Sequence, residues 1–143
     1  MADMQAEFLP GKRVLFTARG RTQVNAREVL PDGPIGYSSA ELLLIALANC
    51  SLGILTSHEL MKDVAYRNCT ATLSCDTLQN PSRFDNFRVV ISLEVDDPAL
   101  LERQPTLERV AGHCPVGNTL SGGAQVNVQL RMTVAGPQAV AVR

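Results

Sequence analysis

The chain has 143 residues, of which 45% are hydrophobic, and a formal net charge of -1 at pH 7. This is enough for one hydrophobic core and too short for two, so we expect a single domain over residues 1–143. The near-zero charge and the lack of a dense Lys/Arg stripe argue against nucleic acid or an anionic membrane surface as a main partner. No long apolar stretch runs without a polar interruption, and the N-terminus lacks a basic segment followed by an apolar one, so we expect a cytoplasmic protein and no membrane partner.

Residues 13–19 and 22–28 are strand-like and flank Gly20-Arg21, which predicts a hairpin with a tight turn. A loop rich in proline and glycine follows at residues 31–36. Residues 39–62 then predict one long helix, which Ser38 or Ser39 would cap. Leucine, isoleucine and alanine occupy nearly every face of this segment until about Leu55, as in a central helix that is buried all round.

The second half of the chain predicts strands and shorter helices, which gives an α+β fold class. Residues 64–78 and 87–95 predict a strand pair, joined by the turn-rich segment 79–83. A helical stretch begins at Asp97-Pro98, is interrupted by Pro105 and ends at Gly112, and Pro115 suits the first position of another helix. Residues 125–134 alternate polar and apolar side chains as a half-exposed strand does.

Two of the four cysteines have contexts that suggest redox chemistry. Cys50 lies inside the apolar helix, where its thiol would be packed. Cys114 precedes Pro115 at a helix start, where free backbone N–H groups favour a thiolate. A packed thiol that meets a thiolate-favouring thiol is the arrangement that two-cysteine redox chemistry requires. In the cytosol all four cysteines would stay reduced, which makes a structural disulfide framework improbable.

Two segments resemble the motifs of a known family. Residues 38–50 (SSAELLLIALANC) resemble its helix motif S-P-x-E-L-L-L-A-A-L-x-x-C, and residues 113–120 (HCPVGNTL) resemble H-C-P-V-x-N-T-L. The family is that of osmotically induced protein C and organic hydroperoxide resistance protein (OsmC/Ohr), and the resemblance is to its OsmC-like branch. It implies an α+β fold with antiparallel sheets around a central buried helix, assembled as an intertwined homodimer. It also implies a cytoplasmic thiol peroxidase of the oxidative stress response that reduces organic hydroperoxides.

The resemblance assigns Cys50 as the peroxidatic cysteine and Cys114 as the resolving one, whereas the local helix-start argument favours Cys114 as the more acidic thiol. It further implies an arginine from the first hairpin that lowers the pKa of the thiol. Arg19 and Arg21 are the candidates, and we prefer Arg19 because it would end a strand that fixes its side-chain direction. A solvated turn arginine is the alternative for either residue.

Glu41 is the acidic partner that the resemblance implies for this arginine. Helix geometry puts Glu41 about 13 Å from Cys50 along the axis and on the opposite side, so it would serve the partner's site in a dimer. The hydroperoxide-resistance branch has its acidic residue directly after a proline, and those two positions here are Ser39 and Ala40. A helix N-terminal acid that stabilises the helix dipole is therefore an equal alternative for Glu41.

We expect no cofactor and no metal ion. A metal site would have to use Cys50, Cys114, His58 and His113. These residues lack the Cys-x-x-Cys or His-x-x-x-His spacing that is typical of metal sites. The two histidines suit helix ends instead. The low aromatic content predicts an aliphatic pocket, which favours lipid-like hydroperoxides as substrates. The expected reductant is a dithiol such as a lipoyl protein. The alternative is a non-catalytic OsmC-like protein that binds a small hydrophobic ligand at the dimer interface.

Overall fold

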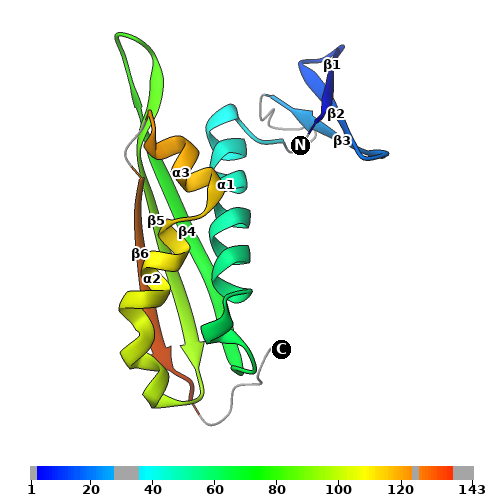
Figure 1. Ribbon diagram of the computed structural model, residues 1–143. Coiled ribbons are helices and arrows are strands. Elements are labelled where there is room, and N and C mark those ends of the chain that lie inside the picture. Colours follow the sequence, from blue (N-terminus) through cyan, green and yellow to red (C-terminus); the bar gives the residue numbers. More distant parts are fainter. Residues whose placement is uncertain (1–2, 28–35, 124–125, 137–143) are drawn as a thin grey trace. The chain divides into compact units, whose positions relative to one another are not determined.

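The computed structural model describes residues 3–27, 36–123 and 126–136. The chain divides into two compact units, residues 1–43 and residues 44–143. Their elements confirm the predicted α+β fold class (Figure 1).

The first unit contains a three-stranded antiparallel sheet in the order β1-β2-β3. Its strands are β1 (Gln5–Leu9), β2 (Arg13–Ala18) and β3 (Arg21–Ala26). The predicted hairpin is confirmed as β2 and β3, but its turn is Arg19-Gly20, with φ values of 51° and 73°. Left-handed backbone at both turn residues matches the twist of the flanking strands. The first strand was not predicted, because its side chains are mostly exposed and show no clear alternation.

The second unit contains a three-stranded sheet in the order β4-β5-β6. It consists of β4 (Tyr66–Leu78), β5 (Arg83–Val95) and β6 (Val126–Val134). The β4–β5 pair is antiparallel as predicted, whereas β5 and β6 are parallel. The prediction of purely antiparallel sheets is thus wrong for this pair, because a helical crossover separates its strands and a parallel pair needs such a long connection.

The crossover supplies the helices that cover β6. It contains the 3-10 helix η2 (Pro98–Arg103), α2 (Gln104–Gly112) and α3 (Pro115–Ser121), which follow the predicted proline and glycine signals closely. Alternate residues of β5 form the centre of the core, together with residues of α2 and β6. These buried side chains are Phe87, Val89, Ile91, Leu93, Val95, Leu107, Ala111 and Leu130.

The long helix α1 (Ser39–Thr56) is shorter than predicted. A separate 3-10 helix, η1 (Glu59–Met61), follows it, and the His58 ring accepts a hydrogen bond from the Leu60 N–H at 3.1 Å. The chain therefore leaves the helical path before Lys62 because a side chain caps a new helical turn.

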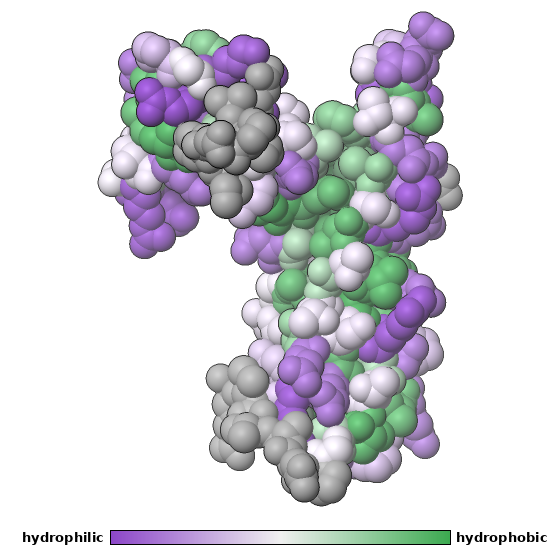
Figure 2. All heavy atoms as spheres, turned by 180° about the vertical axis from the view of Figure 1, so that it is seen from behind, coloured by the Kyte–Doolittle hydropathy of each residue, from purple (hydrophilic) through white to green (hydrophobic). Residues whose placement is uncertain are grey.

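The helix α1 is also less buried than predicted. Of the α1 residues, those buried within the described part of the chain are Leu47, Ser51 and Leu55, one turn apart along a single stripe, while Ile45 on the other side is 44% exposed. Figure 2 shows hydrophobic side chains gathered on the surface of the second unit between polar edges. With 18 residues and a mean hydropathy of 1.7, α1 is long and apolar enough to span a membrane by composition alone, contrary to expectation. Its buried stripe is that of a core helix.

Candidate functional site

The structure brings the two predicted cysteines together. Cys50 lies on α1, and its thiol hydrogen-bonds with the Cys114 side chain and with the backbone of Val116. Cys114 directly precedes α3, so the contact joins the central helix to the crossover between β5 and β6. Two thiols in contact with each other are the pairing from which a disulfide can form.

Cys114 is the N-cap residue of α3, as the position of Pro115 predicted. Its sulfur accepts a hydrogen bond from the Gly117 N–H at 3.3 Å and lies 3.4 Å from Ser51 Oγ. The side chain is fully buried, with no exposed surface. The cysteine thus takes the place of the serine or aspartate that usually caps a helix, and the cap fixes the position of its sulfur.

The two thiols differ in access. Cys50 is only partly buried, so within this chain a solute reaches its sulfur more easily than that of Cys114. Burial raises the pKa of Cys50, the Val116 backbone lowers it, and the hydrogen bond and charge of Cys114 raise it again. Cys50 is therefore a neutral thiol near pH 7 within the described surroundings, and a nearby cation is needed to ionise it.

The structure reverses our reason for preferring Arg19 over Arg21. Arg19 is an exposed turn residue with a φ of 51°, whereas Arg21 is the first residue of β3. The sheet therefore fixes the direction of Arg21 and not that of Arg19, because the turn lies one residue earlier than predicted. Both arginines belong to the first unit and Cys50 to the second, so an arginine–thiol contact stays a prediction.

Glu41 takes part in a reciprocal helix cap with Ser38. The Ser38 N–H donates to Glu41 Oε2 at 2.7 Å, and the Glu41 N–H donates to Ser38 Oγ at 3.2 Å. Hydrogen bonds from the Ser38 backbone, and secondly from its side chain, lower the pKa of Glu41. The cap predicted at Ser38 or Ser39 is thus at Ser38. A contact between Glu41 and an arginine of a second subunit stays a prediction.

The histidines lie at helix ends, as predicted. His58 caps η1, and His113 ends α2 with its Nδ1 2.7 Å from the Arg109 carbonyl oxygen. Cys69 and Cys75 both lie on β4. Within residues 3–27, 36–123 and 126–136, no group of three or more His, Cys, Asp or Glu side chains is placed to hold a metal ion.

Sequence reasoning missed one residue of the site, Ser51. It lies between Leu47 and Leu55 on the buried stripe of α1 and directly follows Cys50. A hydroxyl on an otherwise apolar stripe, beside a motif cysteine, is the signal that could have identified it.

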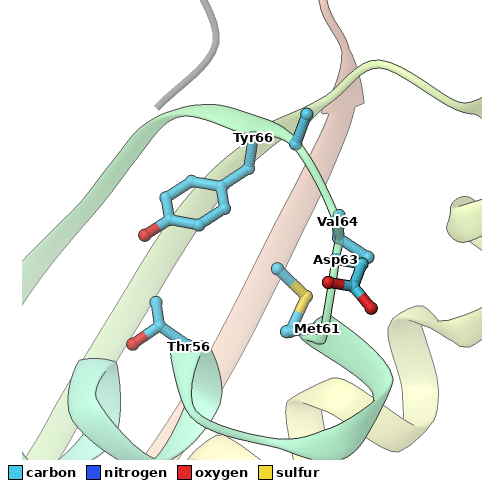
Figure 3. Close-up of a pocket in the computed structure, with 6 residues that line it drawn as sticks. Thr56, Met61, Asp63, Val64 and Tyr66 are labelled. Atoms are coloured by element: carbon cyan, nitrogen blue, oxygen red, sulfur yellow. The ribbon is translucent and has the colours of Figure 1, made fainter. Parts of the chain in front are cut away.

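A cavity of about 380 Å³ lies at the C-terminal end of α1 (Figure 3). Thr56, Met61, Val64 and Tyr66 contribute to its lining, with Asp63 at one side, so apolar walls meet two hydroxyl groups. Thr56 follows Cys50 by six residues, a rise of about 9 Å along the helix. The cavity is thus separate from the thiol pair, and its place at the end of α1 was not predicted from the sequence.

A family model described as OsmC-like protein matches residues 31–129. The comparison with curated protein sequences found no match. An OsmC-like protein from Mycoplasma pneumoniae has a similar structure, with a TM-score of 0.75, 15% identity and coverage of 95% of this chain and 98% of its own. The organic hydroperoxide resistance protein OhrB of Bacillus subtilis follows with a TM-score of 0.60, 18% identity and coverage of 93% and 98%. For the organic hydroperoxide resistance protein OsmC of Legionella pneumophila these values are 0.55, 16%, 95% and 97%. These likenesses confirm the fold, and the family match confirms the resemblance seen in the motifs: the chain belongs to the OsmC-like family.

Proposed function

We propose that this protein is a thiol peroxidase that reduces organic hydroperoxides through Cys50 and Cys114. One observation carries the proposal: a partly buried thiol on α1 is in hydrogen-bond contact with a fully buried thiol at the start of α3. The names of the structurally similar proteins from Bacillus subtilis and Legionella pneumophila support a peroxide-related role.

The more accessible thiol reacts first. The Cys50 thiolate attacks one peroxide oxygen, a sulfur–oxygen bond forms, the oxygen–oxygen bond breaks and an alcohol leaves after taking a proton. The Cys114 sulfur then attacks the Cys50 sulfur, and the sulfenic oxygen leaves as water. A dithiol of the lipoyl class reduces the resulting disulfide through a mixed disulfide and is itself oxidised to a cyclic disulfide.

An arginine of the first hairpin supplies the missing cation. Since burial raises the pKa of Cys50, a guanidinium group is required to hold the thiolate. Arg19 and Arg21 are both candidates for this group, and Arg21 is the one whose direction the strand fixes. Glu41 would orient the guanidinium group through a bidentate contact.

The protein acts as a homodimer in the cytoplasm in this proposal. The side of α1 that includes Ile45, Ala46 and Gly53 is an apolar helix surface that is exposed among the described residues. A second copy would bury it with a gain of about 25 cal/mol per Å² and would bring its own Glu41 to this surface.

Serine substitutions of the two cysteines test the mechanism. We expect Cys50→Ser to abolish peroxide turnover with a dithiol and to leave no sulfenic acid to trap. Cys114→Ser should consume about one equivalent of a fatty-acid hydroperoxide per subunit and then stall with a sulfenic acid on Cys50. A trapped sulfenic acid on Cys114 in the Cys50→Ser protein would reverse the assignment of the two roles.

The cavity at the end of α1 favours a second candidate, a protein that binds a small hydrophobic molecule without turning over peroxide. Its apolar lining at Met61, Val64 and Tyr66 would suit such a ligand. Peroxide consumption that is equally low in the wild type and in both serine variants would support this candidate and reject the peroxidase.

A further inference from the structure

Ser51 is a polar side chain with no exposed surface on the core-facing stripe of α1. Its neighbours along the stripe, Leu47 and Leu55, are also fully buried. A hydroxyl group in such surroundings costs free energy unless it forms a hydrogen bond. The Ser51 Oγ lies 3.4 Å from Cys114 Sγ, so its interaction is with the thiol that has no exposed surface.

Among the described residues, three polar groups contact the Cys114 sulfur. The Gly117 N–H donates to it at 3.3 Å, Ser51 Oγ lies at 3.4 Å, and the Cys50 thiol forms the third contact. A neutral thiol has one hydrogen to give, which either Ser51 or Cys50 accepts. A thiolate has none, so after ionisation the Ser51 hydroxyl must act as the donor. Because the site is closed to water, the stability of that thiolate depends on the few donors that the protein provides.

We infer that Ser51 is a positioning residue for Cys114, whose hydroxyl stabilises the Cys114 thiolate and holds the sulfur beside Cys50. This inference rests on the proposed function, in which Cys114 attacks the Cys50 sulfenic acid. In that step the sulfur–sulfur bond forms as the sulfur–oxygen bond breaks, and the leaving hydroxide takes the proton that Cys114 lost. Ser51 keeps its own proton and is neither oxidised nor reduced.

Few other groups compete for this role among the described residues. On α1 the titratable neighbour of Cys114 is Cys50. His113 precedes Cys114, but its Nδ1 lies 2.7 Å from the Arg109 carbonyl oxygen at the end of α2. The helix α3 (PVGNTLS) contains no charged side chain. The Ser51 hydroxyl and the Gly117 N–H are therefore the local donors to the thiolate.

The test uses a reaction that needs no peroxide. In a Cys69→Ala/Cys75→Ala background, dithiobis-nitrobenzoate reacts with the Cys50 thiolate and releases one coloured thiolate. Cys114 then attacks the mixed disulfide and releases a second, so stopped-flow absorbance follows the step that depends on Cys114. The rate of this second phase is measured across a pH series in the background protein and in its Ser51→Ala variant.

We expect Ser51→Ala to slow the second phase by about tenfold or more near neutral pH, as for loss of a hydrogen bond to a charged group. Its rate profile should also move to higher pH, so that the two proteins converge in alkaline solution. Ser51→Thr, which keeps a hydroxyl, should restore much of the rate at neutral pH. A general packing defect would instead lower the rate equally at every pH, which would overturn the inference.

Ser121→Ala is the matched control, because the Ser121 hydroxyl donates to a backbone partner, the Gly117 carbonyl oxygen, at 2.8 Å. It should leave the second phase unchanged, and a loss as large as that of Ser51→Ala would overturn the inference. An unchanged second phase in Ser51→Ala would also overturn it, while leaving the proposed peroxidase intact. Conversely, a pH shift in this assay without any reaction between Cys50 and a hydroperoxide would support the inference and reject the proposed function.

Discussion

Gly117→Ala probes how tightly the protein holds the Cys114 sulfur. An added Cβ would lie 3.3 Å from Cys114 Sγ, 3.4 Å from the Gly112 carbonyl oxygen and 3.9 Å from Leu47 Cδ1. Overpacking of this kind lowers the free energy of unfolding by about 1–3 kcal/mol, while replacing glycine by alanine inside a helix raises it by about 1 kcal/mol. We therefore expect a net loss of about 1 kcal/mol in the free energy of unfolding.

Gly112→Ala is the matched control for this substitution. Its Cβ would meet only Val128, at 3.7 Å and 3.8 Å, which is ordinary contact. The control should be stabilised by up to about 1 kcal/mol, since it gains helix propensity without a clash. Urea unfolding of both reduced variants at one protein concentration measures the difference, because association would otherwise shift the apparent stability.

We thus expect the two variants to differ by about 2 kcal/mol, with Gly117→Ala the less stable. Equal stability would show that the Cys114 side chain moves aside freely. That result would refute the view that Gly117 and Ser51 hold the sulfur in place.

Four further predictions concern the first unit and α1. Gly36→Ala should destabilise the protein strongly in thermal unfolding, because a Cβ there would collide with the Ala26 backbone. Ser38→Ala should cost about 1 kcal/mol through loss of the helix cap. Glu41→Gln should make the free energy of unfolding depend less on pH in the acid range. The pKa of Glu41 is lowered in the folded protein, so its carboxylate stabilises the fold above the unfolded pKa of 4.5, and this stabilisation is lost as the pH falls through the folded value. Ile45→Asp should yield monomers in analytical ultracentrifugation, and an unchanged mass would reject an interface on this side of α1.

Local signals in the sequence predicted most helix starts and ends. Asp97-Pro98, Gly112 and Pro115 act through backbone geometry and missing N–H groups, which need no knowledge of the tertiary structure. The motif cysteines and their meeting followed from the family resemblance. The end of α1 could not be predicted in this way, because no proline and no glycine at a helix-ending position precede His58.

Other errors had non-local causes. The parallel pairing of β5 and β6 depends on how the crossover returns the chain, which strand patterns do not contain. A shift of one residue in the first turn exchanged the settings of Arg19 and Arg21. Burial of α1 was overestimated because the sequence pattern of an apolar helix is the same whether its own chain or a second copy covers it.

The contact between Cys50 on the central helix and Cys114 on the crossover also affects how a disulfide between them would be reduced. A disulfide between them closes a loop of about 65 residues, which restricts the unfolded chain by about 4 kcal/mol in the chain-entropy description. The oxidised protein should therefore resist heat better than the reduced one, and its disulfide should be correspondingly hard to reduce. A dithiol that closes its own ring on oxidation gains a comparable entropic advantage, whereas a monothiol does not. Because the disulfide closes a long loop, a reductant with two thiols should reduce it more readily than a monothiol.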